Sequence, residues 1–355
     1  MTEQLKQLRN KIDAIDDELL RLINARAQLA QQVGQKKSGV VYRPERESQI
    51  FSRLQQANTG PLRNEHIEHL FTEVISICRA LEEPLTVAYL GPQGTFSEEA
   101  VTKRFGSAVN PMPCSSIDDI FRKVESGAAN YGVVPVENST EGAVGRTMDL
   151  LLQSPLKICG ELQLPIHQCL MAQQAGLSAI RKIYSHPQSF AQCQTWLNEN
   201  LQNLTAADRI DAASNADAAR QAAADSSAAA IAGKQAADVF GLKICAANIE
   251  DNPNNTTRFL VIGNQDVARS GKDKTSLAMA TPNRPGAVHE LLAPFAQHQV
   301  SMTRLESRPS RASLWEYVFF TDIAGHQEDE NVARALQALR DNATFLKVFG
   351  SYPAA

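Results

Sequence analysis

The stretch Asn254-Asn255-Thr256-Thr257-Arg258-Phe259-Leu260-Val261-Ile262 decides the fold assigned to the middle of this chain. Its four apolar residues predict a buried strand, and the asparagines before them predict the loop that delivers it. Thr257 and Arg258 therefore lie where a loop enters a sheet, a common place for ligand chemistry in open α/β folds. A guanidinium can hold a carboxylate through two parallel hydrogen bonds, and a neighbouring hydroxyl can donate or accept one. The plainer alternative is a loop threonine beside a solvated arginine.

Length and composition narrow the class of protein. A chain of 355 residues is too long for one ordinary core and predicts about two to three domains. The 39 acidic and 35 basic residues give a formal net charge of −4, which argues against a nucleic-acid or anionic-membrane partner. No apolar run is long enough to cross a bilayer. Acidic residues near the N-terminus replace the apolar run of a signal peptide, so we expect a cytoplasmic protein.

The cysteines and histidines give no sign of a metal site. The six cysteines are scattered and form no Cys-x-x-Cys pair, which favours free thiols in a reducing compartment. His66 and His69 are three residues apart on a predicted helix, but no third ligand lies nearby, so we interpret them as part of a solvated face. We therefore expect neither a metal nor an organic cofactor.

Apolar residues spaced alternately three and four apart predict one long N-terminal helix with a packing seam. The seam consists of Leu5, Leu8, Ile12, Ile15, Leu19, Leu22, Arg26, Leu29 and Val33. A helix over residues 3–36 would be about 50 Å long at 1.5 Å per residue, too long for one compact unit to bury. We therefore expect it to pack against a second copy in a dimer. Two further helices are predicted, over residues 44–56 and 64–81.

Arg26 places a charge inside that apolar seam, where it must be paired or bind an anion because an unpaired buried charge is costly. Other charged residues near the predicted helix faces and ends could join it: Arg9, Lys37, Arg46, Glu47 and Glu82. The alternative for the set is a group of interhelical salt bridges and ordinary helix-end charges.

As a set, these positions resemble the all-helical chorismate mutases. The resemblance rests on Leu8-Arg9-Asn10-Lys11-Ile12-Asp13 with Asp16, on Leu22 to Gly34, on Lys37, and on Arg43-Pro44-Glu45-Arg46-Glu47, in the family's order and spacing. It implies a helical, dimerising mutase domain over residues 1–83 that rearranges chorismate to prephenate. Such a catalyst holds a dicarboxylate in a compact shape and stabilises the negative charge that grows on the breaking ether oxygen.

The mutase resemblance also implies a role for each charged residue. Arg26, and Arg9 from the other subunit, would take the carboxylates of the substrate. Lys37 would face the ether oxygen and one carboxylate. Glu47 would accept the proton of the ring hydroxyl, and Arg46 would support the site without touching the substrate.

Two positions depart from the mutase pattern. Cys78 stands where a serine is often found, and Glu82 stands where a glutamine often donates a hydrogen bond to the ether oxygen. An ionised carboxylate cannot donate, so Glu82 would have to be protonated in the active form. We therefore expect mutase activity to fall as pH rises.

The residues after Pro84 alternate between strands and helices. Thr86–Leu90 and Tyr131–Val136 are predicted strands, and each is followed by a polar loop expected to open a helix. In the first loop, Thr95 with Glu98 fits a capping box. Two such junctions predict an open parallel sheet with a ligand site at the carboxyl ends of its strands.

A second lobe is expected from about residue 164 to 237, and its alanine-rich part, residues 212–237, suggests short amphipathic helices. Residues 243–249 and 258–262 would return to the first lobe, which leaves a cleft between two halves.

This middle segment, residues 85–265, resembles the prephenate dehydratases. The resemblance rests on Gly91-Pro92-x-Gly94-Thr95-Phe96-Ser97, Val134-Pro135-Val136-Glu137-Asn138-Ser139, Ser185-His186-Pro187-Gln188 and Thr257-Arg258-Phe259. It implies a two-lobed α/β fold like that of periplasmic binding proteins, and conversion of prephenate to phenylpyruvate. Hydroxide is a poor leaving group, so the site must offer it a proton or a strong hydrogen bond. The resemblance implies that Thr257 is this donor, that Arg258 orients a substrate carboxylate, and that the cleft is lined by Thr95, Ser97, Asn138 and Ser139.

After a polar linker over residues 266–274, the pattern strand-helix-strand-strand-helix-strand over residues 275–355 predicts a ferredoxin-like domain. It resembles the ACT regulatory domains, with Gly286-Ala287-Val288 near the family's Gly-Ala-Leu and with Glu306-Ser307-Arg308-Pro309 intact. The resemblance implies that L-phenylalanine binds here, between two subunits, through Gly286, Ala287, Val288, Glu306 and Ser307. The alternative is a simple dimerising module.

The sequence thus predicts a bifunctional enzyme that acts on chorismate and prephenate under phenylalanine feedback, as a homodimer or higher homo-oligomer. One alternative keeps the dehydratase but makes the helices an inert dimerising unit; intact Arg9, Arg26, Lys37 and Glu47 argue against it. Another is a non-enzymatic small-molecule sensor, because a two-lobed cleft with a regulatory domain is also the plan of binding proteins. Intact Thr257-Arg258-Phe259 argues against that alternative.

Overall fold

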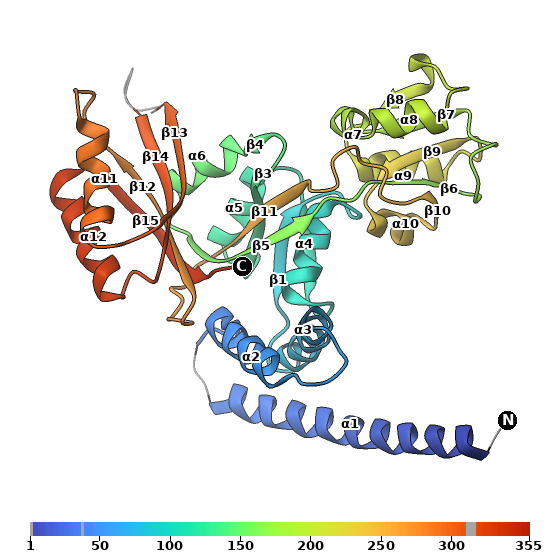
Figure 1. The fold of residues 1–355 in the computed structure, drawn as a ribbon, viewed down its shortest axis with the longest axis horizontal. Helices are drawn as coiled ribbons and strands as arrows, with labels where there is room; N and C mark the ends of the chain where they lie inside the picture. The colour runs from blue at the N-terminus through green and yellow to red at the C-terminus, as the bar shows by residue number, and fades with distance from the viewer. Residues whose placement is uncertain (1–2, 37–38, 310–316) are drawn as a thin grey trace. The chain divides into compact units, whose positions relative to one another are not determined.

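A computed structural model describes residues 3–36, 39–309 and 317–355 (Figure 1). The chain divides into two compact units. The helical unit consists of residues 1–85 together with residues 104–110, and the main unit consists of residues 86–103 and 111–355. Among the described residues, no helix combines the length and the apolar character needed to cross a membrane.

The helical unit contains the three predicted helices, α1 (Glu3–Lys36), α2 (Pro44–Ala57) and α3 (Asn64–Ala80). None of the described residues of α1 is buried. Its seam is open along its length, with Leu8 53%, Ile15 59% and Leu29 61% exposed. An apolar stripe of this kind marks a surface that another chain or element covers.

The core of the helical unit includes residues 104–110, which lie well beyond the predicted domain boundary at residue 83 in the sequence. Tyr42 and Phe105 are both fully buried, and their ring centroids lie 4.8 Å apart. Gly106 has a φ of +74°, and a Cβ there would lie 2.5 Å from the Cβ of Ser76 in α3. The chain thus re-enters this unit along a tight path that only glycine fits.

The first lobe of the main unit is built on a sheet with the strand order β2-β1-β3-β11-β5, with β4 paired to β3. Its elements are β1 (Thr86–Leu90), α4 (Phe96–Phe105), β2 (Asn110–Cys114), α5 (Ile117–Glu125), β3 (Tyr131–Asn138), β4 (Gly142–Ala143), α6 (Gly145–Gln153), β5 (Lys157–Pro165) and β11 (Thr256–Gly263). The expectation of a parallel sheet is wrong. β1 and β3 are parallel, but β11 runs antiparallel to both β3 and β5 because it returns from the second lobe.

The second lobe has its own sheet with the order β10-β6-β9-β7-β8. Its elements are β6 (Cys169–Ala172), β7 (Lys182–Ser185), α7 (Pro187–Gln192), α8 (Gln194–Asn200), η1 (Ala206–Asp208), β8 (Arg209–Asp211), α9 (Asn215–Ala223), β9 (Ala228–Ala232), α10 (Lys234–Phe240) and β10 (Lys243–Ala246).

Of two expectations about the second lobe, the one for its alanine-rich segment is confirmed only in part and the one for residues 243–249 is wrong. The alanine-rich segment contains two helices, but its middle is the fully buried strand β9, whose small side chains let α9 and α10 pack closely. β10 pairs with β6 and stays in the second lobe, so β11 alone returns to the first.

The C-terminal domain has the predicted strand-helix-strand-strand-helix-strand order and a four-stranded antiparallel sheet, β13-β14-β12-β15. Its elements are β12 (Asp273–Ala280), α11 (Ala287–Gln297), β13 (Met302–Pro309), β14 (Tyr317–Ala324), α12 (Glu330–Asn342) and β15 (Phe345–Pro353). Residues 314–316, expected to begin the third strand, lie outside the described residues. The sheet shares a core with the first lobe, where Phe320 and Phe349 pack with Leu260 of β11.

Candidate active sites

The topology of the first lobe gathers the predicted dehydratase residues at one edge of its sheet. β1 and β3 are parallel, so the loops after Leu90 and Asn138 leave at the same edge. β11 is antiparallel to β3, so it begins at that edge with Thr256 and Thr257. Thr95, Ser97, Asn138, Ser139 and Thr257 therefore lie toward the same edge of the sheet, although they are far apart in the sequence.

Asn138 fixes the orientation of the Thr257 hydroxyl. Its Nδ2 donates to Thr257 Oγ1 at 2.8 Å and to Asn255 Oδ1 at 3.0 Å. Its Oδ1 accepts the backbone N–H groups of Thr140 and Glu141, so the amide cannot be flipped without losing both bonds. The Thr257 oxygen is thus an acceptor toward Asn138, which leaves its own proton to be donated elsewhere.

Asn255 belongs to this site and was missing from the predicted set. Only 2% of it is exposed, and its Oδ1 also lies 3.4 Å from the hydroxyl of Thr140. Among the described residues its Nδ2 has no hydrogen-bond partner, which is uncommon for a buried amide. Its place two residues before Thr257, in an asparagine-rich loop, was the available signal.

The loop after β1 is held differently from the expected capping box. Thr95 Oγ1 donates to Leu90 O at 3.1 Å, while the Glu98 carboxylate accepts the N–H of Gly94 at 2.6 Å and the hydroxyl of Tyr89 at 3.1 Å. The loop after β3 also departs from expectation, because a turn and the short strand β4 precede α6. Ser139 there makes two hydrogen bonds with Thr256: its N–H donates to the Thr256 carbonyl at 2.9 Å, and its Oγ accepts from the Thr256 N–H at 2.9 Å.

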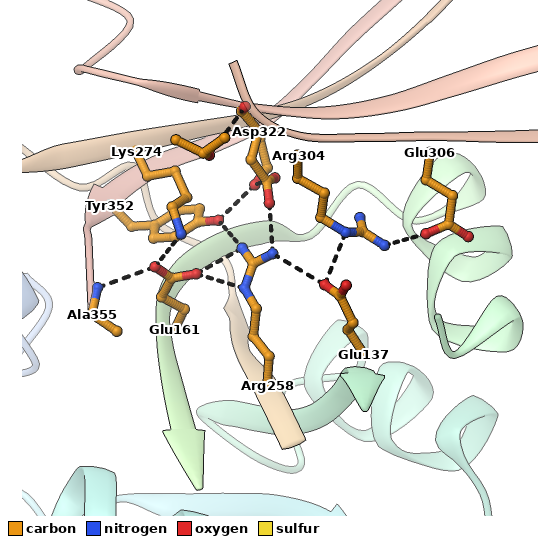
Figure 2. A network of polar contacts seen from close by, with 11 residues as sticks. Glu137, Glu161, Arg258, Lys274, Arg304, Glu306, Asp322, Tyr352 and Ala355 are labelled. Atoms are coloured by element: carbon orange, nitrogen blue, oxygen red, sulfur yellow. Dashed lines mark hydrogen bonds and ion pairs between the residues drawn. The ribbon is translucent and has the colours of Figure 1, made fainter. Parts of the chain in front are cut away.

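Arg258 points to the opposite face from Thr257, because successive residues of a strand alternate. Its Nε donates to Glu161 at 2.7 Å, its Nη1 to Asp322 at 2.6 Å and its Nη2 to the hydroxyl of Tyr352 at 3.1 Å (Figure 2). Burial alone would lower the pKa of Arg258, but these oxygens raise the pKa above its usual value. This geometry does not match the expectation of a substrate carboxylate, since protein carboxylates already hold the guanidinium.

The predicted mutase residues are spread over the helical unit. Arg9 and Arg26 lie about 25 Å apart along α1, at 1.5 Å per residue, so one copy of α1 cannot bring both to one ligand. Arg46 is exposed on α2. Lys37 lies outside the described residues.

Glu47 and Glu82 occupy very different surroundings. Glu47 is 7% exposed, and its Oε1 lies 2.6 Å from Arg79 Nη1, while Arg79 Nη2 donates to the carbonyl of Phe105 at 2.7 Å. Burial raises the pKa of Glu47, against the attraction of Arg79. Glu82 follows α3 and lies against Gly34 of α1, where a Cβ would be 2.9 Å from Glu82 Cγ. Glu82 is therefore beside α1, whereas Glu47 faces the core.

The predicted effector residues lie on two elements of the C-terminal domain. Gly286 has a φ of +78° and caps α11, which continues with Ala287 and the half-exposed Val288. Glu306 and Ser307 lie on the edge strand β13, where Arg304 is paired with Glu306. Within the described ranges, no three His, Cys, Asp or Glu side chains gather in a way that could hold a metal ion.

Comparison with known proteins gives three consecutive family matches. Residues 8–83 match chorismate mutase type II, residues 87–267 match prephenate dehydratase, and residues 275–341 match the ACT domain. A protein of Neisseria gonorrhoeae named bifunctional chorismate mutase/prephenate dehydratase is 53% identical, over 98% of this chain and 96% of its own length. A protein of Aquifex aeolicus with the same name is 43% identical, over 99% of both.

Solved structures resemble the main unit. The prephenate dehydratase of Arthrobacter aurescens in complex with L-Phe has a TM-score of 0.70 and 36% identity, over 76% of this chain and 90% of that one. The prephenate dehydratase of Staphylococcus aureus has a TM-score of 0.66 and 26% identity, over 76% of this chain and all of that one.

Proposed function

Because the chain belongs to the bifunctional chorismate mutase/prephenate dehydratases, we propose how its residues divide the work of the two reactions. It is a bifunctional enzyme of phenylalanine biosynthesis, which rearranges chorismate to prephenate, converts prephenate to phenylpyruvate, and is inhibited by phenylalanine. We propose that the enzyme acts in the cytoplasm.

Thr257 is the proton donor of the dehydratase reaction. The observation that carries this assignment is the 2.8 Å bond from Asn138 Nδ2, which turns the Thr257 proton away from Asn138 and toward a ligand. In prephenate the bond to the ring carboxylate breaks and releases carbon dioxide, and its electron pair enters the ring. The ring hydroxyl leaves from the other end with its bonding pair. A hydrogen bond from Thr257 stabilises the negative charge that develops on that oxygen. The oxygen takes the Thr257 proton and leaves as water, and the Thr257 oxygen recovers a proton from solvent.

Thr95, Ser97 and Ser139 line the same edge of the sheet and bind the polar groups of prephenate. Each stands in or beside a loop that the sheet topology directs to that edge. The hydroxyls of Ser97 and Ser139 can donate to substrate oxygens without adding charge, whereas that of Thr95 donates to Leu90 O and can accept.

The mutase reaction takes place in the helical unit of a dimer. The separation of Arg9 and Arg26 along α1 supports a site that takes one arginine from each copy. The open seam of α1 supports the same arrangement, because a second copy would cover it. Lys37 and Glu82 would face the ether oxygen, and Arg46 and Glu47 would support the remaining contacts.

The C-terminal domain binds L-phenylalanine through residues 286–288 and 306–307. A free amino acid needs a partner for its ammonium group and donors for its carboxylate. Glu306 offers the first, and the N–H groups at the start of α11 offer the second.

A coupled assay tests the whole assignment. Pure protein is given chorismate alone, and prephenate and phenylpyruvate are followed separately, with and without L-phenylalanine. We expect both products, with phenylpyruvate suppressed by phenylalanine. Consumption of added prephenate but not of chorismate would make the helices a dimerising scaffold, and binding of prephenate without turnover would make the chain a sensor.

A further inference from the structure

We propose that Arg258 is a positioning residue of the dehydratase, which ties the strand carrying Thr257 to the C-terminal domain instead of binding prephenate. The inference rests on the proposed roles of Thr257 as donor and of the C-terminal domain as effector site. It gives Arg258 a structural role next to Thr257, the proposed proton donor.

Alternation of side chains along β3 and β11 puts the proposed catalytic residues on one face of the sheet and the residues that bind the C-terminal domain on the other. Thr257 of β11 stands opposite Asn138 of β3, and Arg258 stands opposite Glu137. Directly opposed residues share a face of the sheet, so Thr257 and Asn138 lie on one face while Arg258 and Glu137 lie on the other. Thr257 and Asn138 thus each have, next to them in the chain, a residue that contacts the C-terminal domain.

The first anchor is a buried cluster around Arg258 (Figure 2). Glu161 of β5 accepts from both Arg258 and Lys274, the second of these at 2.6 Å, and Asp322 of β14 accepts from Arg258 at 2.6 Å. The side chains are 11% exposed for Arg258, 0% for Glu161 and 6% for Asp322. Two cations and two carboxylates balance one another here. Because water barely screens them, loss of one partner leaves an uncompensated charge.

The second anchor joins β3 to the C-terminal domain. Arg304 of β13 places its Nε 3.0 Å from the Glu137 carboxylate and also pairs with Glu306 (Figure 2). Glu137 in turn lies 4.0 Å from Arg258 Nη1, so the two anchors touch. Glu306 belongs to the proposed effector site. A continuous series of ion pairs therefore connects the proposed effector site with Glu137 and Arg258, the residues next to Asn138 and Thr257.

Apolar packing does not fix this part of the interface by itself. A cavity of about 20 Å³ lies beside the cluster, lined by Arg258, Arg304 and Asp322 together with apolar side chains from both domains, among them Leu260 and Phe320. A gap of this size holds about one water molecule. The position of β11 against β14 is therefore set by the ion pairs next to the gap as well as by the apolar core that the two domains share.

The decisive variants lie outside the proposed prephenate site. Asp322→Asn removes the charge that holds Arg258, and Tyr352→Phe removes only the hydroxyl that Arg258 contacts. We expect Asp322→Asn to lower dehydratase kcat by roughly 5-fold or more, with less change in KM for prephenate, and to shift the phenylalanine concentration for half-inhibition. Tyr352→Phe should do the same to a smaller degree. Combining Asp322→Asn with Arg258→Gln should cost less than the two separate losses together.

Glu330→Gln is the matched control, because it removes an exposed ion pair with Arg334 from the same domain. It should leave kcat, KM and the phenylalanine response unchanged. Circular dichroism and urea unfolding of each preparation report whether the main unit has folded. Unchanged kcat and phenylalanine response in both Asp322→Asn and Tyr352→Phe, with a raised KM in Arg258→Gln, would overturn the proposal and make Arg258 a substrate ligand. Absence of phenylpyruvate formation by the unmodified protein would instead overturn the proposed function.

Discussion

Asn138 and Thr257 are 119 positions apart in the chain, yet the amide of one donates to the hydroxyl of the other at 2.8 Å. The antiparallel register of β3 and β11 places them directly opposite each other. Because the Asn138 oxygen is held by two backbone N–H groups, the direction of this bond is fixed. The hydroxyl of Thr257 is therefore oriented so that its proton can be donated to a group other than Asn138.

Removing that hydroxyl should nearly abolish the dehydratase. Thr257→Val keeps the shape of the side chain but has no proton to offer, and we expect kcat for prephenate to fall by about 10²- to 10⁴-fold. Thr257→Ser should keep much of the activity. The mutase activity of both variants serves as the control and should not change. A Thr257→Val enzyme with nearly normal kcat would show that the donor lies elsewhere.

Removing the orienting amide should have a smaller effect. Asn138→Ala removes four hydrogen bonds, of which only the one to Thr257 orients the hydroxyl; that neutral bond is worth about 1 kcal/mol, a loss of about 5-fold in kcat. In the double variant with Thr257→Val this part of the loss should disappear, because there is no hydroxyl left to orient. Steady-state kinetics on the four proteins of this cycle provide the measurement. Fully additive losses would mean that Asn138 acts independently of Thr257.

The mutase activity should decline as pH rises. In the proposed mutase site Glu82 faces the ether oxygen, and only a protonated carboxyl can donate a hydrogen bond to it. Glu82→Gln supplies a permanent donor and should flatten the pH profile of kcat/KM for chorismate. The dehydratase profile of the same variant is the control. A mutase profile that is the same in both proteins would remove Glu82 from the site.

The buried pair of Arg79 and Glu47 should be costly to break on one side. Arg79→Met leaves the Glu47 carboxylate without its partner and releases the carbonyl of Phe105, so the free energy of unfolding should fall by about 3–5 kcal/mol. Glu47→Gln in the same chain should recover part of this loss. Urea unfolding followed by helical circular dichroism measures both. Exposed Arg21, paired with Glu18 on α1, provides the comparison, and Arg21→Met should change stability little.

Cys159 should make the main unit sensitive to alkali. Burial raises the pKa of this thiol from 9.0 to about 12, so the folded state favours the neutral form. Its contribution to stability is complete below pH 9 and is lost as pH rises toward 12, because the unfolded thiol ionises first. At pH 10.5 the loss is about 2 kcal/mol. Cys159→Ala should lose less stability between pH 8 and pH 10.5 than the unmodified protein, and an equal loss in urea midpoints would contradict this.

Elements with a strong local pattern were predictable from the sequence. The apolar spacing of α1 placed it over residues 3–36, and the structure has it at Glu3–Lys36. The order of elements in the C-terminal domain is also confirmed. β9 was missed because four alanines and an isoleucine, buried on both sides, carry no periodicity that separates a strand from a helix.

The partners of charged residues were less accessible. Arg258 meets Asp322 and Tyr352, and Arg79 meets Glu47 and Phe105, across separations that no local pattern encodes. One piece of information was available, however. Alternation along a strand requires Thr257 and Arg258 to face opposite ways, so a single ligand in direct contact with both was already disfavoured.

The return of residues 104–110 to the helical unit also has a consequence during synthesis. When residue 85 emerges from the ribosome, helices α1, α2 and α3 have all been synthesised. Phe105, whose ring packs against Tyr42 and whose carbonyl accepts a hydrogen bond from Arg79, is then still inside the exit tunnel. The N-terminal unit therefore waits for the first strand and helix of the next domain before its core can close. If the gene were divided between the two activities near residue 85, the mutase product would lack residues 104–110, which form part of its core.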